Sequence, residues 1–238
     1  MAATYQVKLI DKRELARETF GFYFEKPEGF HYKSGQTLRL TLLNPPETDE
    51  QGNTRIFTIA SAPYEKNILT ASRLRDTAFK RVLKSLPLNS KVEIRGPYGD
   101  FLLHQETAKP AVFLAGGIGI TPFRSMLVQN LEEKLPYSFF LFYSNRKPED
   151  AAFLEEFHLL KNQIKKFTFI PIMTTVDGHL NGDMIKKHLG DLTSAVYYVV
   201  GPPAMVSGMR EVLQSLAVPS DQIKIEEFEG YSLKPAPH

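Results

Sequence analysis

The hydrophobic pattern of the chain changes its period once, close to residue 107, and this change restricts the fold more than any other sequence feature. Beyond residue 110, near-continuous apolar runs alternate with segments of helical spacing. Continuous apolar runs are typical of parallel strands covered on both faces, and strands alternating with helices indicate a doubly wound parallel sheet. We therefore predict strands at 111–114, 138–143, 167–170, 196–200 and 222–225, with helices around 123–131 and 205–216.

Up to residue 106 the pattern is one of short strands with turn signals between them. Strands are predicted at 6–10, 19–24, 37–42, 55–59, 68–72 and 91–95, with one helix near 78–86. Short strands at this spacing favour an antiparallel barrel or sandwich. The polar segment 44–54, with two prolines and one glycine, is predicted to be a surface loop. The expected organisation is an antiparallel β domain, residues 1–107, followed by an α/β domain, residues 108–238.

Composition excludes several classes of protein and of site. The absence of cysteine excludes disulfides, a thiolate nucleophile, a zinc–thiolate site and a cysteine-ligated iron–sulfur cluster. No histidine pair has ligand spacing, so no metal site is predicted, and a net charge of +2 does not indicate nucleic acid or an anionic membrane as a partner. No apolar run approaches the roughly 18 residues of a membrane span, and no secretory signal is visible at the start. A cytoplasmic protein is therefore expected.

A glycine-rich turn opens the second half. Residues Ala115–Pro122 read Ala-Gly-Gly-Ile-Gly-Ile-Thr-Pro and connect the first predicted strand of this half to its first helix, with Thr121 suited to the N-cap and Pro122 to the first helical position. The helix N-terminus would offer free N–H groups to a dinucleotide pyrophosphate. Pro122 stands where an ordinary Rossmann motif has its third glycine. The alternative is a tight turn that only starts a helix.

Five segments together resemble the ferredoxin–NADP reductase-like flavoprotein family. They occur in the order of that family and span nearly the whole chain: 55–61 (Arg-Ile-Phe-Thr-Ile-Ala-Ser), 96–101 (Gly-Pro-Tyr-Gly-Asp-Phe), 116–122 (Gly-Gly-Ile-Gly-Ile-Thr-Pro), 200–205 (Val-Gly-Pro-Pro-Ala-Met) and 226–228 (Glu-Glu-Phe). The resemblance implies an FAD-binding antiparallel β-barrel at 1–107 and an NAD(P)-binding α/β domain at 108–238. It also implies FAD and NAD(P)H as cofactors.

On the flavin side, the resemblance assigns Arg55 to the flavin pyrophosphate and Phe57, in place of the family's usual tyrosine, to the isoalloxazine ring. Thr58 corresponds to the hydroxyl beside flavin N5, and Ser61 completes the motif. The second phosphate cradle of the family corresponds to residues 77–80, where Thr77 and Lys80 would supply a hydroxyl and a charge. FAD rather than FMN is the expected flavin. The motif does not fix this choice, because the cradle departs from the family pattern.

On the nicotinamide side, the resemblance assigns Phe228 to the cover of the flavin and Glu226 to its polar partner, with Tyr231 as a rival for the cover. The remaining assigned residues are Gly116, Gly117, Gly119, Thr121, Pro122, Gly201, Pro202 and Met205 in the nicotinamide nucleotide site, with Ser144 and Arg146 for a 2′-phosphate. Met205 also begins the apolar stripe of its helix, so core packing is an alternative for it. Arg146 has an ion pair with Asp150 as its alternative. The choice between NADH and NADPH stays open.

The resemblance implies an NAD(P)H-dependent reductase in which Thr58, Glu226 and Phe228 form the catalytic set. Because the chain has no cysteine for a fused iron–sulfur domain, the acceptor would be a separate molecule such as ferredoxin, flavodoxin or an oxygenase component. One alternative is reduction of free flavin, quinone or a ferric chelate, and a second is a non-catalytic flavin- or nucleotide-binding subunit or sensor. A basic cluster lies near the flavin end: Arg73, Arg75, Lys80, Arg81 and Lys84. It would either steer an acidic partner or serve phosphate neutralisation and solubility. No oligomeric state is predicted.

Overall fold

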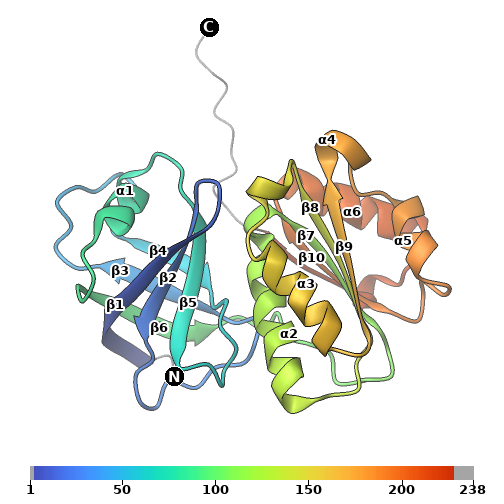
Figure 1. The fold of residues 1–238 in the computed structure, drawn as a ribbon, viewed down its shortest axis with the longest axis horizontal. Helices are drawn as coiled ribbons and strands as arrows, with labels where there is room; N and C mark the ends of the chain where they lie inside the picture. The colour runs from blue at the N-terminus through green and yellow to red at the C-terminus, as the bar shows by residue number, and fades with distance from the viewer. Residues whose placement is uncertain (1–2, 228–238) are drawn as a thin grey trace, which may run out of the picture. The chain divides into compact units, whose positions relative to one another are not determined.

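The computed structural model describes residues 3–227, and the chain divides into two compact units (Figure 1). Within the described residues, the first unit contains 3–103, 121–135 and 149–163, and the second contains 104–120, 136–148 and 164–227. The chain therefore passes between the units several times. The predicted boundary between sequence domains, at residues 107 and 108, stays a prediction.

A six-stranded antiparallel sheet forms most of the first unit, in the order β4-β3-β6-β1-β2-β5. Period-two alternation places one face of each strand in a common core that includes Val7, Phe22, Phe24, Leu40 and Ile94. The predicted strands are confirmed, and the first is longer than predicted because it continues past the core into a hairpin with the second. The elements are β1 (Ala3–Ala16), β2 (Thr19–Glu25), β3 (Thr37–Leu42), β4 (Thr54–Thr58), β5 (Asn67–Arg73), α1 (Ala78–Ser85) and β6 (Lys91–Tyr98).

A five-stranded parallel sheet forms the centre of the second unit, in the order β11-β10-β7-β8-β9. Its strands are β7 (Ala111–Gly116), β8 (Phe139–Asn145), β9 (Phe167–Met173), β10 (Val196–Gly201) and β11 (Ile223–Glu227). Every residue of β7 and β10 is buried, as the continuous apolar runs predicted. The helices α5 (Gly182–His188) and α6 (Pro203–Ser215) contribute Ile185, Val206 and Leu213 to the same core. The predicted α/β fold is confirmed.

The strand order reverses at β7, which has β8 and β9 on one side and β10 and β11 on the other. Open α/β sheets bind ligands at the carboxyl ends of the strands beside such a reversal. Gly116 and Gly201 are the last residues of β7 and β10, so the fold brings both to this edge of the sheet.

The helix after the glycine turn begins differently from the prediction. A 3₁₀ turn over Gly117–Ile120 runs directly into α2 (Thr121–Glu133), so Thr121 is the first helical residue rather than the N-cap, and Pro122 is the second. Both side chains are buried. The short helices α3 (Leu154–Gln163) and α4 (Thr174–Asp177) complete the elements used below. No helix within residues 3–227 is both long and apolar enough to cross a membrane.

Candidate functional site

Four residues predicted to line the nicotinamide site lie together at the ends of β7 and β10. A Cβ atom added to Gly116 would lie 2.3 Å from Met205 Sδ and 3.0 Å from Pro202 Cδ, and one added to Gly201 would lie 3.1 Å from the same sulfur. The two glycines therefore make room for the Met205 side chain. Met205 also packs against the core of the second unit, so the core-packing alternative accounts for part of its surroundings.

The local structure also explains why glycine occupies the other two positions of the turn, Gly117 and Gly119. A Cβ atom at Gly119 would lie 2.4 Å from the carbonyl oxygen of Val200 and 3.0 Å from the amide nitrogen of Gly201. Gly117 has a φ of 54°, in the left-handed region that favours glycine. Close approach to β10 and backbone conformation thus explain these glycines without a ligand. The role of the turn in binding a pyrophosphate stays a prediction.

The predicted 2′-phosphate residues lie at the end of β8. Ser144 pairs in register with Gly116, and the exposed Arg146 follows the strand. The carbonyl oxygen of Arg146 accepts a hydrogen bond of 2.8 Å from Thr175 Oγ1 in α4. Among residues 3–227, Asp150 pairs with Arg17 at 2.6 Å rather than with Arg146, its alternative partner. Within the described part of the chain, the Arg146 guanidinium forms no ion pair.

Glu226 is the one member of the predicted C-terminal pair that the structure describes. It lies in β11 in register with Val200, beside the edge of the sheet that carries Gly201. Burial raises the pKa of Glu226 to about 7, and its Oε2 atom is buried without a hydrogen-bond partner among residues 3–227. Phe228 and Tyr231 lie outside the described residues, so the cover of the flavin stays a prediction.

In the first unit, β4 alternates Arg55 and Phe57 on one face with Ile56 and Thr58 on the other. Thr58 is only 3% exposed, and its Oγ1 finds no hydrogen-bond partner in the described structure. Phe57 is 8% exposed and packs against Phe79 of α1, with ring centroids 6.0 Å apart. Phe57 therefore belongs to the barrel core, and its contact with an isoalloxazine ring stays a prediction.

The Arg55 guanidinium is held by the loop that precedes β4. Its Nη1 donates to the carbonyl oxygens of Gln51 and Gly52 at 2.9 Å each, and its Nη2 donates to Asp49 Oδ1 at 2.8 Å. The same guanidinium lies 4.9 Å from the centre of the Phe79 ring. These contacts fix Arg55 beside the first turn of α1.

The first turn of α1 carries the second predicted phosphate cradle. Thr77 is the N-cap and its hydroxyl accepts from the backbone N–H of Lys80 at 3.3 Å, while Lys80 Nζ donates to the carbonyl oxygen of Arg73 at 2.8 Å. Burial lowers the pKa of Lys80 to about 8, and the charges of Arg75 and Arg55 lower it further. Arg55, Arg75 and Lys80 thus form a cation cluster at a helix N-terminus whose first turn holds no acidic residue.

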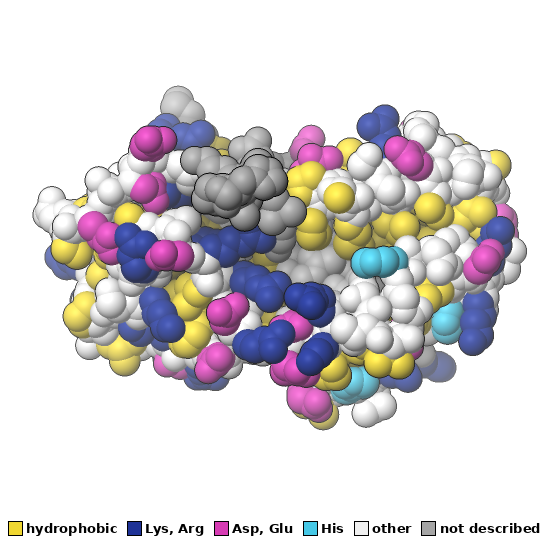
Figure 2. Space-filling view, turned by 90° about the horizontal axis from the view of Figure 1, so that it is seen from above, with side chains coloured by type: hydrophobic (Ala, Val, Ile, Leu, Met, Phe, Trp, Pro, Cys, Tyr) yellow, Lys and Arg dark blue, Asp and Glu magenta, His cyan; other side chains and the backbone are white. Residues whose placement is uncertain are grey.

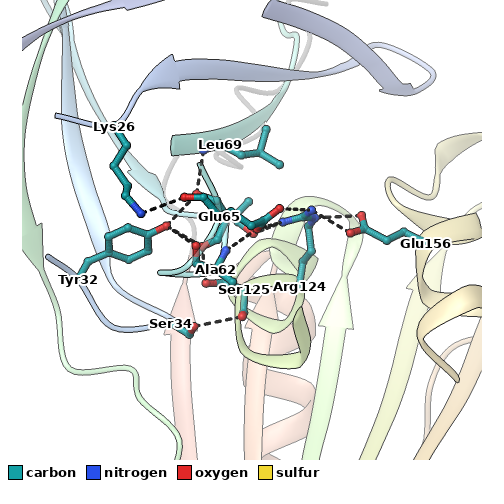
Figure 3. A network of polar contacts seen from close by, with 11 residues as sticks. Lys26, Tyr32, Ser34, Ala62, Glu65, Leu69, Arg124, Ser125 and Glu156 are labelled. Atoms are coloured by element: carbon teal, nitrogen blue, oxygen red, sulfur yellow. Dashed lines mark hydrogen bonds and ion pairs between the residues drawn. The ribbon is translucent and has the colours of Figure 1, made fainter. Parts of the chain in front are cut away.

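Ser61 lies in a polar network that the motif did not predict. Figure 3 labels three of its partners, Tyr32, Leu69 and Ser125. Its carbonyl oxygen accepts from Ser125 Oγ of α2 at 2.6 Å, and its hydroxyl accepts from the backbone N–H of Leu69 at 2.9 Å. Arg124 of α2 donates to the Glu65 carboxylate at 2.9 and 3.1 Å, and to the carbonyl oxygen of Ala60 at 2.8 Å. The network joins α2 to the segment that directly follows β4.

Arg124 has a second carboxylate on its other side. Its Nε donates to Glu156 Oε2 of α3 at 2.9 Å, and its Nη2 lies 2.8 Å from Glu156 Oε1. The Arg124 side chain is 9% exposed, whereas those of Glu65 and Glu156 are 28% and 33% exposed. A buried guanidinium is therefore paired on both sides, and sequence analysis missed it because its helix face is otherwise apolar.

Two of the five residues in the basic cluster predicted to steer an acidic partner, Arg73 and Arg81, are paired with carboxylates. Arg81 binds Glu47 at 2.6 Å and also pairs with Asp76, and Arg73 lies 3.9 Å from Asp150. On the face shown in Figure 2, Lys and Arg side chains are interspersed with Asp and Glu side chains rather than forming an uninterrupted basic patch. The steering role stays a prediction.

The residues present fit a flavin with a phosphate group. The cation cluster beside the first turn of α1 suits a phosphate, because helix N-termini and charged donors bind anions. The buried Thr58 hydroxyl without a partner suits a polar edge of a ring system, because such groups are costly to leave unpaired.

Comparison with known proteins finds similarity to reductases. Residues 113–211 match the family described as "Oxidoreductase NAD-binding domain". Over 216 residues the chain is 26% identical to the reductase component of propane 2-monooxygenase from Rhodococcus jostii, and over 217 residues 29% identical to that from Mycolicibacterium smegmatis. Each alignment covers 85% of this chain but only 57% and 61% of the relative, so the chain spans about three-fifths of their length.

Solved structures share the fold over nearly the whole chain. A ferredoxin NADP⁺ reductase from Neisseria gonorrhoeae with bound FAD and NADP superposes with a TM-score of 0.81 at 20% identity, covering 94% of this chain and 98% of that one. A cytochrome P450 reductase from Amycolatopsis superposes with a TM-score of 0.82 at 20% identity, covering 95% of this chain and 70% of that one. At this identity the likeness shows the fold.

Proposed function

We propose that the chain is an FAD-dependent NAD(P)H reductase, because it shares its fold with a ferredoxin NADP⁺ reductase and matches the family described as "Oxidoreductase NAD-binding domain" over residues 113–211. It would pass electrons from the nicotinamide through FAD to a separate acceptor. The observation that carries the proposal is the pairing of two sites within one chain. One is the cation cluster and Thr58 in the antiparallel unit, and the other is the glycine turn at the strand-order reversal of the parallel unit.

Each residue has a defined task in this proposal. Arg55 and Lys80 bind the flavin phosphates, and Thr58 donates or accepts a hydrogen bond at the edge of the flavin ring. Gly116, Gly201 and Met205 shape the place of the nicotinamide nucleotide at the carboxyl ends of β7 and β10. Glu226, with a pKa of about 7, holds or releases a proton beside that edge. Bound FAD supplies the step between two-electron hydride transfer and one-electron release.

An oxygenase component is the acceptor class that the comparisons favour. The two relatives described above are named as reductase components of a monooxygenase, a kind of protein that serves a separate oxygenase. Ferredoxin and flavodoxin remain the other protein acceptors in the proposal. A cytoplasmic location stays a prediction.

The experiment that tests this function starts from the purified protein loaded with FAD. NADH or NADPH is supplied, and electron transfer is followed to ferredoxin, flavodoxin, an oxygenase component, free flavin, a quinone and a ferric chelate. The proposal expects turnover with a protein acceptor at a higher kcat/KM than with any small molecule. Turnover with none of the acceptors would favour a non-catalytic binding subunit.

The pH dependence of FAD binding should report Lys80. A bound phosphate would raise the pKa of this lysine from about 8, so binding above pH 8 takes up a proton. Affinity for FAD should therefore fall as pH rises from 8 to 9.5, by up to about tenfold per pH unit. Fluorescence titrations at each pH would measure the dissociation constant of FAD. The control Lys80→Met is expected to bind FAD more weakly and to show no change in affinity over this pH range. An equal slope in Lys80→Met would contradict the assignment.

Arg146 should set the preference for NADPH, because its guanidinium is exposed and forms no ion pair within residues 3–227. Arg146→Ala is expected to lower kcat/KM for NADPH at least about tenfold, the value of one lost charge-assisted contact, and to leave NADH unchanged. Lys147→Ala, the same truncation one residue along, is the matched control. Equal losses with both nucleotides would remove Arg146 from the 2′-phosphate site.

A further inference from the structure

The loop between β3 and β4 is held over the start of α1. Glu47 in this loop accepts hydrogen bonds from Arg81 of α1, at 3.0 Å from Nε and 2.6 Å from Nη2. The base of the loop is closed where the backbone N–H of Leu42 donates to the carbonyl oxygen of Asn53 at 2.9 Å, and where Asn53 Nδ2 donates back at 2.8 Å. The loop therefore has a defined position on the helix, and Asp49 lies at its turn.

The Asp49 carboxylate binds Arg55, one of the two residues assigned above to the flavin phosphates. It accepts from Arg55 Nη2 at 2.8 Å, and the backbone N–H of Phe79, in the first turn of α1, helps to lower the pKa of this carboxylate. The backbone N–H of Gln51 donates to it at 3.0 Å. Desolvation acts to raise the pKa of Asp49, but the hydrogen bonds and the charge of Arg55 outweigh it and lower the pKa below its ordinary value. Asp49 is thus an anion at neutral pH.

A second anion at this place would compete with Asp49. Arg55 is the residue common to both, and its side chain is only 18% exposed, so few directions are open to its guanidinium. The nearby Lys80 is influenced by Arg75 and Arg55, and no carboxylate contributes to its pKa shift. The cation cluster thus attracts phosphate, while the carboxylate already on Arg55 repels it.

We propose that Asp49 is an intramolecular competitor of the flavin phosphates, whose release from Arg55 is required before the phosphates bind there. The inference rests on the proposed function, because it takes Arg55 as the phosphate partner. When only a fraction of the molecules has Arg55 released, the apparent affinity equals the intrinsic affinity multiplied by that fraction. Asp49 therefore weakens FAD binding.

Three flavins and two matched variants test this proposal. FAD and FMN carry phosphate and riboflavin does not, and their dissociation constants are measured by flavin fluorescence with the full chain. Asp49→Asn should tighten FAD and FMN about fivefold, the value of one partly exposed ion pair, and leave riboflavin unchanged. Asp76→Asn is the control, because it removes the same charge beside α1 from a residue whose ion pair is with Arg81.

A third variant loosens the loop between β3 and β4 without changing a residue that contacts Arg55. Glu47→Gln weakens the contact with Arg81 and should tighten FAD by a smaller factor, in the same direction. Thermal unfolding of each variant checks that the fold is kept.

The outcomes separate the inference from the proposed function. Weaker or unchanged FAD binding by Asp49→Asn would overturn the inference, and weaker binding would mean that Asp49 orients Arg55 for the ligand. An equal gain with riboflavin, or in Asp76→Asn, would also overturn it, because the gain would then not pass through the phosphate site. Failure of the unmodified chain to bind any of the three flavins would overturn the proposed function and the inference together.

Discussion

Arg124→Met is expected to lower the free energy of unfolding by about 3 kcal/mol. The substitution removes a guanidinium that is 9% exposed and leaves Glu65, Glu156 and the carbonyl oxygen of Ala60 without their partner. Breaking a buried ion pair from one side typically costs about 3–5 kcal/mol, and the partial exposure of both carboxylates favours the lower end. Chemical denaturation followed by circular dichroism would measure the loss.

Arg81→Met provides the matched control for this loss. Arg81 also pairs with two carboxylates of the first unit, Glu47 and Asp76, but its side chain is 49% exposed. Exposed ion pairs contribute about 1 kcal/mol or less, so the control should lose little stability. Adding Glu65→Gln and Glu156→Gln to Arg124→Met should restore part of the loss, because no unpaired charge then remains. Equal losses in Arg124→Met and Arg81→Met would contradict the burial argument.

Gly119→Ala is expected to destabilise the second unit by about 3 kcal/mol, because the added methyl group would lie 2.4 Å from a backbone carbonyl oxygen of β10. Overpacking of this kind typically costs about 1–3 kcal/mol, and a backbone neighbour has little freedom to move away. The matched control is Gly208→Ala in α6, where the same methyl group would meet nothing within 4 Å. Alanine there is expected to be neutral or to stabilise the helix by up to about 1 kcal/mol.

Differential scanning calorimetry of the two alanine variants would check this prediction. The result also bears on how the glycine turn is tested for ligand binding. A large loss in Gly119→Ala would mean that substitutions at this residue report folding before they report nicotinamide affinity. An unchanged unfolding temperature would contradict the close approach of the turn to β10.

The strands of the parallel sheet were within reach of the sequence because burial imposes a period on the chain. Continuous apolar runs such as residues 196–200 become strands buried on both faces, and β10 has no exposed residue. The site residues near the glycine turn follow, since Gly116 and Gly201 end neighbouring strands. Periodicity thus fixes which residues reach the carboxyl edge of the sheet.

Pairing over long sequence separations could not be predicted in the same way. Arg124 lies in a buried face of α2, where a charged residue breaks the helical pattern, and its partners Glu65 and Glu156 follow no spacing rule. Asp49 lies in a polar loop that offers several acidic residues of equal standing, and only the folded loop places one of them on Arg55. The sequence also does not show that Gly119 lies against β10, because that contact forms only in the assembled sheet. Sequence analysis therefore explained this glycine by a ligand alone.

Transfer of hydride from a nicotinamide to bound FAD is the central claim of this account, and rapid anaerobic mixing measures it most directly. FAD-loaded protein is mixed with NADPH or NADH, and the oxidised flavin absorbance is followed within a single turnover. The account predicts complete bleaching whose rate saturates with nucleotide concentration and slows when the transferred hydrogen is deuterium. A flavin that is bound but keeps its oxidised spectrum with both nucleotides would contradict it.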